Sequence, residues 1–201
     1  MDELYNRQQT LPLKNLKSVA VIGCGGTGSW VAQGIALSGV PEIALFDPDM
    51  FEETNFNRIP LPLTCIGQNK AEATRDHLKT LRPDTNFVVF GRADSFSLSQ
   101  VSPDVLFDCT DDSEFQEWLE SYCKEKKITY IRSGYNGGNH ISAVGQLSKF
   151  KTKLPRVRRY EIQPSWACPA ALAGMLAVYK AMLNPDFGFV GNISELGVKV
   201  K

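Results

Sequence analysis

The stretch Ser18-Val-Ala-Val-Ile22-Gly23-Cys-Gly-Gly-Thr-Gly28 decides the fold of this chain. Its first residues are mostly apolar and β-branched, as in a buried strand, and apolar residues recur at helical spacing after it, up to Ser38. A glycine turn between a strand and a helix lets the backbone approach a phosphate, whose charge the helix N-terminus stabilises. The pattern therefore predicts a nucleotide site at this turn, and close packing of strand on helix is the other explanation for the glycines.

Strands and helices alternate through the rest of the chain. The predicted parallel strands are Ser18–Ile22, Glu42–Phe46, Phe87–Phe90, Val105–Cys109 and Thr129–Arg132. The predicted helices are Ser29–Ser38, Gln68–Leu81, Ser113–Lys124 and Pro169–Leu183. Ile141–Leu147 alternates like a half-buried strand, and we expect it to run antiparallel to the others.

This alternation predicts an α/β fold with a Rossmann-like, doubly wound, mostly parallel sheet and an antiparallel C-terminal strand. We expect one domain over residues 1–201, with an N-terminal arm at 1–17 and a crossover loop at 148–167. Lys149–Arg159 within that loop is strongly basic, which suits either a partner's acidic surface or solvent.

Composition excludes several classes of protein. With 43% hydrophobic and 22% charged residues, the chain can bury a core and is not a disordered or fibrous sequence. Basic and acidic residues both number 22, so no global charge attracts nucleic acid or a membrane surface. No apolar run approaches the roughly 20 residues of a membrane span, and Met1–Lys17 lacks the apolar core of a signal peptide. We therefore expect a cytoplasmic protein.

The five cysteines are Cys24, Cys65, Cys109, Cys123 and Cys168, and no two of them have Cys-x-x-Cys spacing. A zinc site or a disulfide framework is therefore not expected.

Polar residues stand at the predicted strand ends. Asp47 closes the second strand about 20 residues after Gly28, where an acid accepts hydrogen bonds from a ribose. Arg58, Lys70 and Asp111 also fall near strand ends or helix starts, which line the ligand crevice of a doubly wound sheet. A dehydrogenase has little use for such cations, whereas a polyphosphate reaction needs cations and a metal-binding carboxylate. The pattern favours phosphate chemistry, with an NAD(P)-dependent oxidoreductase as the alternative.

The order of the motifs is more specific than any one of them. Tyr5-Asn-Arg7-Gln8 precedes the glycine turn, and Asp-x-Asp-x5-Asn-x-x-Arg follows it at Asp47, Asp49, Asn55 and Arg58. Gly67-x-x-Lys70 and Asp108-x-Thr-Asp111 come next. From Leu4 to about Gly145 the chain resembles the ThiF/MoeB/HesA-type adenylyltransferases, relatives of the ubiquitin-activating enzymes.

The resemblance implies an activity and the residues that perform it. The expected reaction is ATP-dependent activation of the C-terminal carboxylate of a small ubiquitin-like or sulfur-carrier protein ending in glycine, with release of pyrophosphate. Asp47 would bind the ATP ribose, Asp111 would ligate Mg²⁺, and Arg7 would reach the partner's site in a homodimer. Arg58 and Lys70 would bind phosphates and share the catalytic role with Arg7 and Asp111. The remaining cofactor-binding residues would be Gly23, Gly25, Gly26, Gly28, Asp49 and Asn55.

The chain also departs from the family pattern. The two Cys-x-x-Cys pairs typical of the family are absent, and Cys168, next to Pro169, is the one candidate nucleophile for a second, covalent step. A helix N-terminus can lower a thiol pKa, but cysteine is also a common buried residue, and we favour a structural role. A further alternative is that the chain is the catalytically silent half of a heterodimeric activating enzyme. Another is that it adenylates a peptide or activates a carboxylate on modified tRNA, as some relatives do.

Overall fold

The computed structural model describes residues 3–136, 140–145 and 164–193. Strand β1 (Ser18–Ile22) is buried along its whole length at the centre of the molecule. Because successive strand residues point to opposite faces, Val19 and Val21 pack with one core, and Ala20 and Ile22 pack with the other. A strand buried on both faces explains the continuous apolar run that precedes the glycine turn.

The strands form one sheet in the order β3-β2-β1-β4-β5-β6-β7. Those that follow β1 are β2 (Glu42–Phe46), β3 (Asn86–Phe90), β4 (Val105–Asp108), β5 (Thr129–Asn136), β6 (His140–Val144) and β7 (Phe189–Asn192). The first five strands are parallel, and β6 and β7 are antiparallel to their neighbours. The predicted fold class is therefore confirmed.

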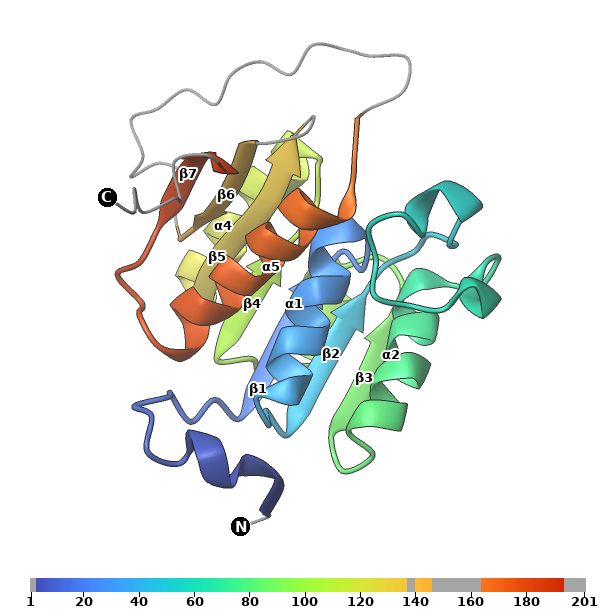
Figure 1. Ribbon diagram of the computed structural model, residues 1–201. Helices are drawn as coiled ribbons and strands as arrows, with labels where there is room; N and C mark the ends of the chain where they lie inside the picture. The colour runs from blue at the N-terminus through green and yellow to red at the C-terminus, as the bar shows by residue number, and fades with distance from the viewer. Residues whose placement is uncertain (1–2, 137–139, 146–163, 194–201) are drawn as a thin grey trace, which may run out of the picture.

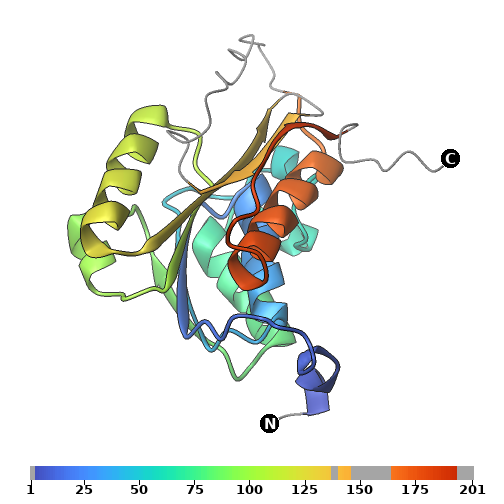
Figure 2. The ribbon, with the colours of Figure 1, turned by 90° about the vertical axis from the view of Figure 1, so that its left-hand side faces the viewer.

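The helices cover both faces of the sheet (Figures 1 and 2). On one face lie α1 (Gly26–Leu37), α2 (Lys70–Leu81) and α5 (Ala167–Met182), and on the other lie α3 (Ser95–Ser99) and α4 (Ser113–Lys126). Short 3-10 segments are η1 (Glu3–Gln8), η2 (Glu53–Asn55) and η3 (Leu63–Cys65). No helix in this described part of the chain is long and apolar enough to cross a membrane.

The chain reverses its direction of growth across the sheet beside β1. Strands β2 and β3 are added on one side of β1, and β4 and β5 are added on the other. Ligands of open α/β sheets bind at the carboxyl ends of the strands, where this reversal leaves a crevice. The glycine turn after β1 lies there, and η1 lies at the opposite end of the sheet (Figures 1 and 2).

The C-terminal third differs most from the sequence-based expectation. Strand β5 continues to Asn136, four residues beyond its predicted end, because pairing with β6 supports the extension. Helix α5 begins at Ala167, and β7 was not predicted at all, since its four residues carry too short a pattern. Most of the crossover loop and all of Lys149–Arg159 lie outside the described residues.

Gly28 has a packing role that can be tested. A Cβ at Gly28 would lie 1.7 Å from the carbonyl oxygen of Gly23, whereas a Cβ at Gly25 would meet nothing within 4 Å. Gly28→Ala should therefore lower the free energy of unfolding in urea by about 3 kcal/mol, because backbone atoms must move apart. Gly25→Ala should lower it by less than about 1 kcal/mol, the typical effect of alanine at a helix N-cap. Equal losses would contradict this role for Gly28.

Candidate functional site

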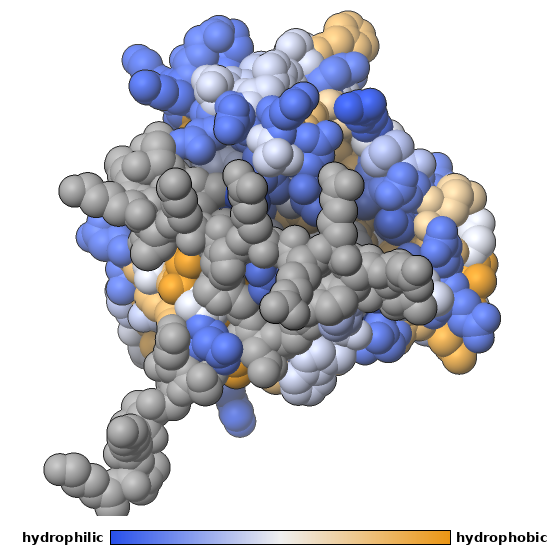
Figure 3. Space-filling model, turned by 90° about the horizontal axis from the view of Figure 1, so that it is seen from above, coloured by the Kyte–Doolittle hydropathy of each residue, from blue (hydrophilic) through white to orange (hydrophobic). Residues whose placement is uncertain are grey.

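A cleft of about 710 Å³ runs along the carboxyl ends of β1 to β5. Seen from above, this end of the molecule presents many hydrophilic residues among those that the structure describes (Figure 3). Most of the sequence-predicted site residues line this cleft: Gly23, Gly25, Gly26, Asp47, Asp49, Arg58, Lys70 and Asp111. Residues far apart in the chain thus form one site.

The glycine turn forms the floor of the cleft over β1. Gly23 has a φ of +88°, a backbone conformation that favours glycine. Gly25 is the N-cap of α1 and has no side chain to occupy the helix N-terminus. The start of α1 therefore borders the cleft without a capping side chain, at the positive end of the helix dipole, which suits a phosphate group.

Asp47 holds the turn in place. Its Oδ2 accepts a hydrogen bond from the backbone N–H of Cys24 at 2.7 Å, and its Oδ1 accepts one from the N–H of Asp49 at 2.9 Å. The residue is 5% exposed, and burial raises the pKa of its carboxyl, while the two N–H groups and Lys70 oppose that rise. Asp47 is therefore both a structural clamp and a cleft residue.

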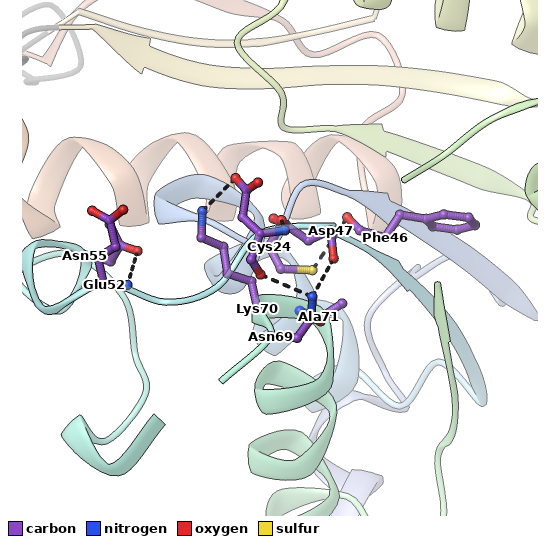
Figure 4. A network of polar contacts seen from close by, with 9 residues as sticks. Cys24, Phe46, Asp47, Glu52, Asn55, Asn69, Lys70 and Ala71 are labelled. Atoms are coloured by element: carbon purple, nitrogen blue, oxygen red, sulfur yellow. Dashed lines mark hydrogen bonds and ion pairs between the residues drawn. The ribbon is translucent and has the colours of Figure 1, made fainter. Parts of the chain in front are cut away.

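Lys70 carries its positive charge at a helix N-terminus, which is electrostatically unfavourable. It is the first residue of α2, where the helix dipole repels positive charge. Its Nζ lies 3.1 Å from Oδ2 of Asp49, and the two side chains are 16% and 67% exposed. Figure 4 shows Lys70 beside Asp47 and Asn69. The side-chain oxygen of Asn69 caps α2, and its amide N–H donates to the Asp47 carbonyl at 3.0 Å. The arrangement favours an added anion next to Lys70.

Arg58 lies over the start of α1. Its side chain is 3.3 Å from the point that a Cβ on Gly26 would occupy, so a side chain at position 26 would displace it. Its Nη1 donates to the Thr54 carbonyl at 2.7 Å and to Oδ1 of Asn57 at 2.9 Å. Its own carbonyl accepts from Nε1 of Trp30 at 2.9 Å, which joins the loop to α1.

The aspartates at the end of β4 and just after it have different roles. Asp108 is fully buried, and its carboxylate accepts hydrogen bonds from the Tyr130 hydroxyl at 2.5 Å and the Thr110 hydroxyl at 2.7 Å. Asp112 caps α4 through the N–H groups of Glu114 and Phe115. Asp111, between them, is exposed and lines the cleft, and its carboxylate is free of the capping task of Asp112, so it can meet a ligand.

Two predicted binding residues do not line the cleft. Gly28 packs α1 against the turn, as its close approach to Gly23 shows. Asn55 uses its side-chain oxygen to accept from the Glu52 N–H at 3.1 Å in a capping box, away from Asp47 and Lys70 (Figure 4). These two assignments came from the motif, and motif spacing does not show where a side chain points.

Arg7 and Cys168 also lie outside the cleft. Arg7 is exposed in η1, at the far end of the sheet, so it does not reach the cleft of its own chain. The Tyr5 ring packs against Gly39, and Nε2 of Gln8 donates to the Ser38 carbonyl at 3.0 Å, which docks the arm on the turn after α1. Cys168 is half-buried in the first turn of α5.

The structure adds cleft residues that the motifs missed. Arg92 follows β3, Tyr135 lies near the end of β5, and Ser165 lies just before α5, and all three line the cleft. Their positions depend on sheet pairing and on the return of the chain to α5. The strand-end rule could have indicated Arg92, since it falls two residues after β3, but no local pattern marks Ser165.

The fold and the cleft define a doubly wound α/β protein with a polyphosphate-type site, built from a glycine turn, three cations and exposed carboxylates. The chain belongs to the ThiF family, whose model matches residues 3–161. This membership confirms the resemblance that the ordered motifs indicated.

The relatives act on different substrates. Ubiquitin-like modifier-activating enzyme 5 of Caenorhabditis briggsae is 34% identical over 191 residues, which are 83% of this chain and 44% of that protein. Molybdopterin-synthase adenylyltransferase of Haemophilus influenzae is 28% identical over 98% of this chain and 83% of its own length. The crystal structure of E. coli MccB with AMPCPP and MccA has a TM-score of 0.67 and 25% identity, covering 82% of this chain and 55% of that one. This chain thus spans less than half of the first relative.

The clamp role of Asp47 predicts a difference between two carboxylates of the cleft. Asp47→Asn should lower the free energy of unfolding in urea by at least about 1 kcal/mol, because an amide NH₂ cannot accept from a backbone N–H and leaves one donor unsatisfied. Asp111→Asn should change it by less than about 0.5 kcal/mol, since Asp111 is exposed. A stable Asp47→Asn protein would contradict the clamp.

Proposed function

We propose that this chain is an ATP-dependent adenylyltransferase that activates the C-terminal carboxylate of a small ubiquitin-like or sulfur-carrier protein and releases pyrophosphate. The observation that carries the proposal is that Arg58, Lys70 and Asp111 converge on the cleft around the glycine turn. Family membership and the similarity to molybdopterin-synthase adenylyltransferase of Haemophilus influenzae support it.

The cleft suits in-line attack of a carboxylate on the α-phosphate. The substrate carboxylate is ionised at neutral pH, so no general base is needed. The open N-terminus of α1, Arg58 and Lys70 supply positive potential where charge develops on the phosphates and on departing pyrophosphate. Asp47, at the end of β2, accepts hydrogen bonds from the ribose hydroxyls. Catalysis by these residues is positioning plus charge neutralisation.

Asp111 is the residue that would hold Mg²⁺. Protein sites for Mg²⁺ commonly use one or two carboxylates and complete the shell with substrate phosphates and water, which fits an exposed carboxylate in the same cleft as Arg58 and Lys70. The ion would neutralise charge on the phosphates. In the described residues no group of three or more His, Cys, Asp or Glu forms a metal cage of its own.

A homodimer explains the position of Arg7. The arm docks through Tyr5 and Gln8, and Arg7 stays exposed and distant from the cleft of its own chain. We infer that it enters the cleft of a second copy, where a guanidinium can pair bidentately with phosphate oxygens. If the chain were instead an NAD(P)-dependent oxidoreductase, Arg58, Lys70 and Asp111 would have no role in the reaction.

We assign no covalent step to the cysteines. Desolvation raises the pKa of the Cys109 thiol in the cleft and of the Cys24 thiol beneath it, so both are protonated at neutral pH. Cys168 does not line the cleft, and we retain its structural role. Peptide substrates, as in MccB with MccA, are the second candidate, because this chain has the same fold.

Pyrophosphate exchange with ATP and candidate glycine-ending proteins tests the activity. Asp111→Ala should abolish Mg²⁺-dependent exchange in a folded protein, and Arg58→Ala and Lys70→Ala should each lower turnover at least tenfold, about 1.4 kcal/mol of transition-state stabilisation. Lys79→Ala, an exposed lysine on the same helix as Lys70, should leave the rate unchanged. Full exchange in Asp111→Ala, or a nicotinamide-dependent activity, would refute the proposal.

Subunit mixing tests the role of Arg7. Arg7→Ala and Asp111→Ala proteins, each inactive alone, should regain roughly a quarter of wild-type exchange after random subunit exchange, because half the dimers have one intact site. Mixing Arg58→Ala with Asp111→Ala should restore nothing if Arg7 alone acts in trans, since both residues line the same cleft. An active monomer, or no recovery despite measured exchange, would exclude action in trans.

A further inference from the structure

A chain of hydrogen bonds joins three segments that are far apart in the sequence. Nη1 of Arg58 donates to Oδ1 of Asn57 at 2.9 Å, and Nδ2 of Asn57 donates to the Ser165 carbonyl at 2.8 Å. The hydroxyls of Ser165 and Tyr135 share a hydrogen bond of 2.5 Å, in which either can donate. The loop after β2, the segment before α5 and the end of β5 are thus linked around the cleft.

The Tyr135 hydroxyl lies at the start of α1. It is 2.7 Å from the point that a Cβ on Gly26 would occupy, and the Arg58 side chain is 3.3 Å from the same point. A phenol and a guanidinium therefore flank the first residue of the helix that faces the phosphates. When Ser165 donates to the Tyr135 oxygen, the phenolic proton is available to an anion in the cleft.

The order of the strands gives the cleft two chemically different ends. Asp47, Asp49 and Lys70 belong to the β2 side, and the glycine turn after β1 comes next. At the β5 end the lining consists of Gly134, Tyr135, Asn136, Pro164 and Ser165, none of them charged. A Cβ on Gly134 would meet nothing within 4 Å, so there is room above the strand. Arg58 approaches this end only at Tyr135, over Gly26, so the rest of it suits a peptide chain and one carboxylate better than a triphosphate.

We propose that Tyr135 binds the carboxylate of the second substrate and that Ser165 is the positioning residue that orients its hydroxyl. The inference rests on the proposed adenylation. The phenolic O–H donates to one carboxylate oxygen while the other attacks the α-phosphorus, forming the new P–O bond. The bond from the α-phosphorus to pyrophosphate breaks, pyrophosphate leaves with the electron pair, and Tyr135 keeps its proton.

Two small-molecule probes separate the two ends of the cleft. Glycyl-sulfamoyladenosine mimics the glycyl adenylate, and α,β-methylene-ATP carries the nucleotide and phosphates alone. Calorimetry should show that Tyr135→Phe weakens glycyl-sulfamoyladenosine binding about tenfold, the size of one lost hydrogen bond to a polar or charged group. Its affinity for α,β-methylene-ATP should stay within about twofold.

Ser165 variants and a distant tyrosine complete the test. Ser165→Ala should weaken glycyl-sulfamoyladenosine binding in the same selective way, and Ser165→Thr, which keeps the hydroxyl, should restore it. Tyr122→Phe, on α4 and outside the cleft lining, should leave both affinities unchanged. A purely structural role would move both affinities together and would not respond to the restored hydroxyl.

Each other outcome decides a specific point. Failure of the wild-type protein to bind either probe would contradict the proposed adenylation itself. If the wild-type protein binds α,β-methylene-ATP and not glycyl-sulfamoyladenosine, or if Tyr135→Phe affects both probes equally or neither, the carboxylate site at Tyr135 is overturned while the nucleotide site remains.

Discussion

The two hydrogen bonds that the Asp47 carboxylate accepts from the backbone hold the site together. One comes from Cys24 in the glycine turn and the other from Asp49 in the loop after β2, so a single side chain joins the ends of two neighbouring strands. Asn69 then ties α2 to the same loop through the Asp47 carbonyl. The position of Lys70 depends on these bonds, because it begins the helix that Asn69 caps.

The electrostatics of the cleft are arranged before any ligand arrives. Two helices, α1 and α2, begin there and present the positive ends of their dipoles, and Lys70 and Arg58 add full charges. Placing Lys70 at a helix N-terminus is costly, and the nearby Asp49 offsets that cost at 3.1 Å. A bound phosphate can likewise offset the charge of Lys70. Because the helix dipoles are held in place, they do not have to reorganise as negative charge develops.

In the proposed reaction the two substrates lie over different strands of the sheet. Because β2 and β5 lie on opposite sides of β1 and β4, Asp47, Asp49 and Lys70 lie apart from the uncharged lining at β5, and Arg58 reaches toward that lining over Gly26. The N-terminal arm lies at the other end of the sheet, where Tyr5 packs on Gly39. Within one chain, Arg7 and the cleft are therefore kept apart by the length of the strands.

The sequence by itself determined the fold class, the glycine turn and most of the charged residues that line the cleft, because hydrophobic periodicity and strand-end chemistry are local signals. Gly28 and Asn55 show the limit of motif spacing, since each satisfies a packing or capping need outside the cleft. Only the tertiary structure placed Tyr135 next to Ser165 and over Gly26, because that contact joins residues 30 positions apart across β5 and α5. Contacts of that kind depend on how complete elements pack, which no short stretch of sequence specifies.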